Sequence, residues 1–208
     1  MLVVLVGGCS SGGPTAGTPT ATAPAATASA ATAGTEPSAE PSAAAQSAVA
    51  AESNPPGDIP DNIAFVAYSN TAGRYRFTHP EGWAEKTHGS TVTFTDKLNG
   101  VQASTGAATT APTIATAKQQ DVPVLARSQA AFELRTITDA TAPAGHGVRI
   151  VYRRNSAPDA VTGRQYRDEV ERYELVSHGR EVIVELFGPV GADNVDAYHT
   201  MITSLKIL

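Results

Sequence analysis

Residues 74–105 of the chain are RYRFTHPEGWAEKTHGSTVTFTDKLNGVQAST, and this stretch decides the expected fold. Apolar and polar side chains alternate over Arg74–His79 and again over Thr91–Asp96, the pattern of strands with one buried face. Asn99-Gly100 follows the second strand and predicts a type I′ hairpin turn, because this pair tolerates positive φ angles. Val101–Ser104 is the expected return strand, so the stretch predicts an antiparallel hairpin.

The rest of the chain adds more strands and two helical segments. Thr113–Arg127 has helical character that a proline interrupts, and Asp193–Leu205 repeats apolar residues at helical spacing, with Asp193 as the expected N-cap. The apolar positions of Gln165–Ser177 change parity, which predicts a β-bulge near Arg172. The other expected strands are Ala64–Tyr68, Phe132–Thr138, Val148–Arg153 and Glu181–Phe187.

The order of these elements predicts the fold class. Parallel strands need a crossover for each connection, usually a helix, and two helical segments are too few for that. We therefore expect an α+β domain over residues 62–208, with a mainly antiparallel sheet of about six or seven strands and a C-terminal helix. A segment of this length is long enough for one hydrophobic core.

The N-terminus has the features of a lipid anchor. The chain begins MLVVLVGGCS, with an apolar run before Gly7, Gly8 and Cys9. This is the lipobox pattern at which bacterial lipoproteins receive diacylglycerol, and it predicts lipidation of Cys9; the alternative is a chance cysteine in a disordered terminus. A complete secretory signal has a basic start and about 7–15 apolar residues, so residues 1–9 are a partial signal and we expect the natural start upstream. Cys9 is the only cysteine, which excludes an internal disulfide and Cys-based metal sites.

A tether follows the anchor. Residues 10–61 consist mostly of Ala, Thr, Pro, Ser and Gly, a composition that predicts disorder and a root-mean-square reach of roughly 40 Å. All 15 Lys and Arg residues lie at or after Arg74, so the net charge of −5 belongs to the tether and its junction. The folded part is neutral, which favours neither nucleic acid nor electrostatic binding to a membrane.

Two groups of residues give the chain a family resemblance. The first is YRFTHPEGW, residues 75–83, followed by VTFTD, residues 92–96. The second is the closing segment VERYELVSHGREVIVELFGPVGADNVDAYHTMITSLKIL, residues 170–208. Over residues 64–208 the chain resembles PsbP-like domains, in particular actinobacterial lipoproteins of the LpqN type. The resemblance implies an αβα sandwich around an antiparallel sheet. It also implies an accessory or binding role, since members include an extrinsic photosystem subunit and a nuclear-import cofactor.

A dense run of charges and the loop before it form the candidate binding surface. The charge run consists of Arg167, Asp168, Glu169, Glu171, Arg172 and Glu174. Arg154 directly follows the expected strand Val148–Arg153, Asp159 lies in the long loop 155–163, and Arg167 and Asp168 belong to the next strand. Long loops beside a rigid sheet often carry binding residues, so we expect these four side chains to bind a partner. The alternative is that the charge run covers the solvent side of a hairpin, where cross-strand pairs contribute little.

Other candidate sites have simpler explanations. His79, Glu81 and His88 flank one turn and could hold a divalent metal, but their spacing matches no ligand motif, so we expect a solvated turn and no metal. Trp83 could form a sugar-binding platform or cap the core, and we expect the cap. The chain contains no nucleophile-elbow, phosphate-loop or zinc-protease motif, so we expect no catalytic residues and no cofactor.

Together these features predict a non-enzymatic cell-envelope lipoprotein, an accessory or adaptor that docks another envelope protein. We expect a monomer that the lipid on Cys9 holds at the extracytoplasmic face of the cell membrane. The alternative is a lipoprotein that binds a small ligand (lipid, glycan or metal), which predicts a sizeable apolar pocket between sheet and helix. A third hypothesis, an unrecognised hydrolase, predicts titrating groups that converge in a cleft.

Overall fold

The computed structural model describes residues 46–51 and 57–208. Cys9, the lipobox and most of the predicted tether therefore lie outside the described residues. The strands are β1 Phe65–Asn70, β2 Tyr75–Pro80, β3 Ala84–His88, β4 Thr91–Asp96, β5 Asn99–Ala107, β6 Glu133–Ala142, β7 Gly145–Asn155, β8 Arg167–Ser177, β9 Arg180–Pro189 and β10 Lys206–Ile207. The helical segments are α1 Ile114–Thr116, the π-helical η2 Ala117–Asp121, α2 Val122–Ser128 and α3 Val195–Ser204.

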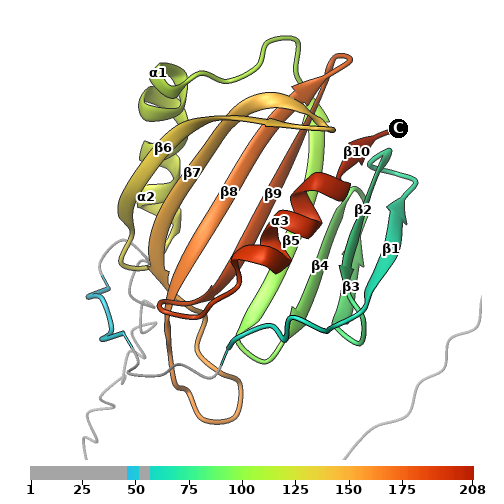
Figure 1. Cartoon of the computed structure of the whole chain (residues 1–208). Coiled ribbons are helices and arrows are strands. Elements are labelled where there is room, and N and C mark those ends of the chain that lie inside the picture. The colour runs from blue at the N-terminus through green and yellow to red at the C-terminus, as the bar shows by residue number, and fades with distance from the viewer. Residues whose placement is uncertain (1–45, 52–56) are drawn as a thin grey trace, which may run out of the picture. The chain divides into compact units, whose positions relative to one another are not determined.

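Two antiparallel sheets and helices on both sides of the larger sheet make up the fold (Figure 1). The larger sheet has seven strands in the order β3-β4-β5-β9-β8-β7-β6, and the smaller has three in the order β1-β2-β10. The expected α+β class, the mainly antiparallel sheet and the C-terminal helix are confirmed. Within the described ranges, no helix is long and apolar enough to cross a membrane.

The main core lies between the seven-stranded sheet and the layer formed by α3 and the smaller sheet. Tyr75 and Phe77 of β2 and Met201 of α3 belong to the same buried cluster as Phe94 and Leu186 of the larger sheet. We call this side of the larger sheet the core face. The apolar side chains that alternate along β2 and β4 therefore lie in the same core, between the two sheets.

A second cluster lies on the opposite side of the larger sheet, which we call the helix face. Ala117 and Leu125 of the helical segment α1–α2 pack on Ile150 and Tyr152 of β7 and on Val170 of β8. In Figure 1 this helical segment lies near β6 and β7, whereas α3 crosses in front of β5 and β9. The helical segment thus covers one side of the helix face, and the strands from β3 to β5 lie outside it.

The β-bulge expected near Arg172 is wrong. β8 keeps an unbroken register with both β7 and β9. The apolar parity changes along this strand because Val170 packs on the helix face, whereas Leu175 packs on the core face. A strand that is covered on both sides has no single apolar face, so its sequence does not alternate simply. A register shift occurs instead in β6, between Leu134 and Thr136.

The turn expected at Asn99-Gly100 is also wrong. Asp96 pairs with Asn99, so the turn residues are Lys97 and Leu98, with Lys97 at a φ of 51°. Gly100 already belongs to β5, where a Cβ atom would lie 2.1 Å from the ring of Phe187. The glycine therefore serves close packing across the sheet rather than the turn.

Three further expectations need correction. β3, with the polar sequence AEKTH, was not expected, because all five residues are exposed and give no apolar alternation. The N-cap residue of α3 is Asn194 rather than Asp193, and the Asn194 side chain accepts a hydrogen bond from Ile59 N instead of capping the helix. The helix at 113–127 continues through Pro123 because a π-helical turn precedes it and the proline lies in the first turn of α2.

The domain also begins earlier than the expected residue 62. Ile59 is 5% exposed and belongs to the main core, and Gly57 O accepts a hydrogen bond from Asn99 at 2.6 Å. The segment 46–51 contacts the domain through Asn155, whose side chain accepts from Val49 N at 3.0 Å. These described parts of the predicted tether are therefore attached to the folded domain.

Candidate functional site

Strand alternation divides the charge run of β8 between the two faces of the sheet. Glu169 and Glu171 lie on the core face, where each pairs with an arginine of β7. Arg153 Nε donates to Glu169 at 2.9 Å, and Arg149 forms a two-pronged pair with Glu171. These pairs are partly exposed, and such pairs contribute at most about 1 kcal/mol each. This half of the run matches the alternative of a solvent-facing hairpin.

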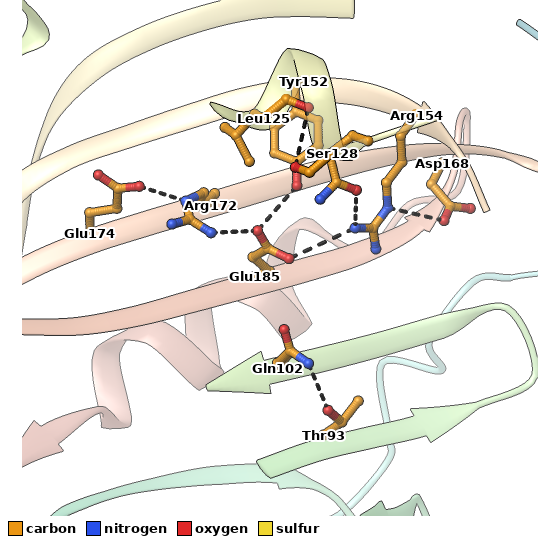
Figure 2. Close-up of polar contacts among 11 residues, drawn as sticks. Thr93, Gln102, Leu125, Ser128, Tyr152, Arg154, Asp168, Arg172, Glu174 and Glu185 are labelled. Atoms are coloured by element: carbon orange, nitrogen blue, oxygen red, sulfur yellow. Dashed lines mark hydrogen bonds and ion pairs between the residues drawn. The ribbon is translucent and has the colours of Figure 1, made fainter. Parts of the chain in front are cut away.

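The other half of the run forms a chain of alternating charges on the helix face (Figure 2). Arg172 pairs with Glu174 and donates to Glu185 of β9 at 2.7 Å. Arg154 of β7 continues the series, because its Nη1 lies 3.8 Å from Glu185 and its Nε lies 3.9 Å from Asp168. We call these five residues, in the order Glu174, Arg172, Glu185, Arg154 and Asp168, the ion-pair chain.

Uncharged groups hold the ion-pair chain in place. The Tyr152 hydroxyl donates to Glu185 at 3.1 Å, and Arg154 Nη1 donates to Gln129 Oε1 at 2.9 Å. Gln129 is the C-cap residue of α2, so the end of this helix positions the arginine. The Arg154 guanidinium also lies over the ring of Phe187, 5.1 Å from its centroid, which is a cation–π contact.

Burial dominates the electrostatics of the ion-pair chain. Glu174 and Asp168 are 2% and 3% exposed. Burial raises the pKa of Asp168 to about 7, and Arg154 and Arg167 oppose this only in part. Burial would lower the pKa of Arg172, but Glu174 and Glu185 outweigh this and raise it, so this arginine stays charged. Asp168 is therefore a member of the chain that changes charge near neutral pH.

A cleft of about 300 Å³ opens at the Asp168 end of the ion-pair chain. Arg154, Asp168 and Phe187 line it from the sheet. Lys97 and Leu98 of the β4–β5 turn line one side, and the loop between β7 and β8 lines the other. The cleft thus combines a buried carboxyl group, a charged rim and apolar wall residues.

The structure brings together three of the four predicted binding residues. Arg154, Asp159 and Asp168 all line the cleft. Asp159 is also needed by its own loop, because its Oδ1 accepts from Val161 N at 3.1 Å and from both the backbone and the hydroxyl of Thr162 at 2.8 Å. Those hydrogen bonds lower the pKa of Asp159.

Arg167 lies away from the cleft. It is 5% exposed, and its guanidinium donates to Ala131 O at 2.7 Å and to Glu133 at 2.9 Å. It therefore connects β8 to the segment that enters β6. Strand alternation explains this placement, since Arg167 and Asp168 are neighbours in sequence and point to opposite faces.

Three residues that were not among the predicted ones complete the site, namely Glu185, Phe187 and Tyr152. One signal could have identified the first of these. Glu185 interrupts the apolar sequence VIVELF, residues 182–187, and a charge buried in a central strand needs partners on the neighbouring strands. Gln129 carries no comparable signal, because only the packing of α2 brings it near Arg154.

His79 and Trp83, on either side of the turn between β2 and β3, are buried in the domain. His79 is 8% exposed, stacks on Phe94 with 3.6 Å between ring centroids, and has its pKa lowered by burial. Trp83 is 7% exposed and belongs to the main core cluster, which matches the core cap rather than the sugar platform. In the described ranges, no three His, Cys, Asp or Glu side chains are grouped so that they could hold a metal ion.

No family model and no curated protein matches the chain. Among solved structures, it is similar to the Ran-binding protein Mog1p of Saccharomyces cerevisiae, with 8% identity, 70% of this chain and 96% of that chain covered, and a TM-score of 0.47. It is similar to cyanobacterial PsbP of Synechocystis, with 15% identity, coverage of 73% and 98%, and a TM-score of 0.47. LpqN of Mycobacterium tuberculosis, described as involved in cell envelope biogenesis, has 11% identity, coverage of 70% and 91%, and a TM-score of 0.36. At these scores the similarities give no information about what this chain does.

Proposed function

We propose that the chain is a non-enzymatic envelope lipoprotein that acts as a monomeric accessory or adaptor. A lipid on Cys9 holds it at the extracytoplasmic face of the cell membrane, and the domain docks another envelope protein. The lipobox and the PsbP-like sequence pattern support the anchored, accessory class. The observation that carries the docking role is the part of the helix face that the helical segment leaves uncovered.

Along one row of paired residues, the side chains on the helix face change from apolar to charged and then to neutral polar. Ile150 is buried under the helical segment, and Arg172 and Glu185 follow it as members of the ion-pair chain. Gln102 and Thr93 come next, joined by a 3.1 Å hydrogen bond (Figure 2). We call the helix-face side chains of β3, β4 and β5 the open half; its members are Ala84, Lys86, His88, Thr91, Thr93, Thr95, Gln102 and Ser104.

The chemistry of the open half suits a reversible protein contact. Its side chains are mostly short and neutral, so ordering them against a partner loses little rotamer entropy. Interfaces that form and separate are about as polar as the rest of a protein surface, so the lack of an apolar patch is compatible with docking. The strands beneath are paired on both sides in β4 and β5, which gives the partner a rigid surface.

The small-ligand alternative has less support. A ligand held between sheet and helix needs a pocket of roughly 300–1,000 Å³. Two spaces beside α3 are smaller than this: one that Asn194 and Tyr198 help to line is about 80 Å³, and one that Phe65 and Ala197 help to line is about 180 Å³. Met201 and Ile202 fill the neighbouring interior, at 1% and 7% exposure.

The hydrolase hypothesis has less support too. Asp168 titrates near neutral pH in a cleft, as such a site would require. The one serine lining that cleft is Ser156, and its hydroxyl donates to Ala157 O and accepts from Tyr166 N. A nucleophile in contact with a base is therefore not formed there.

Site-specific photo-crosslinking in cells tests the docking role. A crosslinking amino acid at Gln102 of the full lipoprotein probes the open half, and one at Thr138, exposed on the core face of β6, is the matched control. We expect one dominant envelope protein to be captured from position 102 and not from position 138. That protein, once purified, should bind the lipoprotein and bind the Gln102→Arg variant more weakly. Equal capture from both positions, or none from position 102, would contradict docking through the open half.

A further inference from the structure

The carboxyl group of Asp168 is nearly buried but is open to the cleft on one side. Its side chain is 3% exposed, and the nearest charged atom is Arg154 Nε at 3.9 Å, which is too far for a hydrogen bond. Across residues 46–51 and 57–208, no donor makes a hydrogen bond to either oxygen. Every fully buried side-chain nitrogen or oxygen of the described residues has a hydrogen-bond partner, so the Asp168 oxygens are not sealed in and reach solvent. Because Asp168 lines the cleft, a donor from another molecule can replace water on these oxygens from that side.

The charges around Asp168 show which kind of donor fits. The ion-pair chain alternates in sign and contains three carboxylates but only two guanidinium groups. It ends on a carboxylate at the cleft, so the next member of the series would be a cation. Arg167, the other cation that acts on Asp168, is already paired with Glu133 at 2.9 Å.

The charges at the rim have other contacts. Lys97 lies 4.0 Å from Asp96, and Arg164 lies over the ring of Tyr166, 4.9 Å from its centroid. Asp159 uses one carboxylate oxygen to hold its own loop. In the structure, none of these rim groups donates a hydrogen bond to Asp168.

We propose that the cleft receives a basic side chain, lysine or arginine, of the docked envelope protein, and that Asp168 pairs with its cationic end. This inference rests on the proposed docking function and names the chemistry of the partner at one point of contact. The cation would complete the alternation of the ion-pair chain and supply hydrogen bonds to both carboxyl oxygens. Leu98 and Phe187 would contact the methylene stem, as apolar surfaces do for long basic side chains.

Three small probes test the proposal on the full chain by NMR. Nα-acetyl-lysine amide carries the ammonium group, the norleucine analogue has a similar stem without charge, and the glutamate analogue has the opposite charge. We expect the lysine probe alone to shift the backbone amide signals of Arg154 and Asp168 in a saturable way. In Asp168→Asn this binding should weaken at least tenfold. Glu169→Gln, the same change one residue away on the opposite face, should bind as the wild type does.

The other outcomes each overturn the proposal. Equal shifts with the norleucine probe would show a merely apolar cleft, and binding of the glutamate probe would assign an anion site to Arg154 and Lys97. Unchanged lysine binding in a folded Asp168→Asn variant would remove Asp168 from the site. Photo-crosslinking from Gln102 separates this proposal from the docking function: a crosslink that survives Asp168→Asn at full yield keeps docking and overturns the basic contact. Probe binding without any crosslink overturns docking, and with it the assignment of the site to a docked protein.

Discussion

Replacing Asp168 by asparagine tests the buried charge at the end of the ion-pair chain. The carboxyl group is 3% exposed, and burial raises its pKa from 3.8 to about 7. Asparagine has nearly the same shape and carries no charge. We expect the variant to be more stable than the wild type at neutral and alkaline pH, because burial disfavours the charged carboxylate and Arg154 and Arg167 offset this only in part.

The size and the sign of the effect follow from the two pKa values. Below 3.8 the carboxyl group is protonated in both the folded and the unfolded chain, so burial of charge has no effect. Between 3.8 and about 7 the unfolded chain releases its proton while the folded domain keeps it, so stability falls as the pH rises. Each tenfold difference in proton affinity is worth about 1.4 kcal/mol, so the full loss is roughly 4 kcal/mol. Asparagine lacks this dependence, so its advantage should grow from near zero at about pH 4 to roughly 4 kcal/mol at about pH 8.

Urea unfolding, followed by the fluorescence of Trp83, measures this difference. Trp83 is the only tryptophan and is 7% exposed, so its emission reports the loss of the core. Other titrating groups, such as His79, are shared by both proteins and cancel in the difference. Glu169→Gln is the control, and its stability difference from the wild type should show no comparable growth with pH. Parallel pH profiles for wild type and Asp168→Asn would refute the reasoning, because they would show that Asp168 is ionised equally in both states.

Two other substitutions test contacts that sequence alone did not reveal. Gly100→Ala should destabilise the domain by about 1–3 kcal/mol in thermal unfolding, because the new Cβ would lie 2.1 Å from the Phe187 ring. Gly106→Ala is the control and should cause no loss of stability, because a Cβ there has nothing within 4 Å. A Gly100→Ala variant as stable as the control would contradict the packing of the ring on β5. Asn155→Ala should speed hydrogen–deuterium exchange at the amide of Val49, since the 3.0 Å bond from that amide is lost, and an unchanged rate would show that segment 46–51 is held by other contacts.

The strands that sequence predicted well are those with one buried face. Tyr75 and Phe77 alternate with exposed arginine and partly buried threonine, and Val92 and Phe94 alternate with threonine. The period of two is then visible in the residues themselves. β3 was missed for the opposite reason, because its five residues are all exposed and no period exists.

The candidate site was predictable only in part. Arg154 and Asp168 face each other on adjacent strands, and the order of expected strands already placed them near one another. Which side of β8 each charge takes was not predictable, because Asp168 and Arg167 differ by one position and the apolar residues of this strand do not alternate simply. Glu185 and Gln129 were not predictable either, because they belong to β9 and to the end of α2, which are far apart in sequence and meet only in the fold.

The sequence by itself determined the α+β class, most of the strands, the C-terminal helix and the expectation of a lipid anchor at Cys9. These follow from local periodicity, composition and short motifs, which act between residues close together along the chain. Only the tertiary structure decided that Asp168, Arg172 and Glu174 of the charge run join the ion-pair chain, whereas Glu169 and Glu171 form partly exposed pairs on the core face. The physical reason is that the helical segment and α3 cover different parts of the sheet, and burial by those layers determines which charges lose water and must find partners.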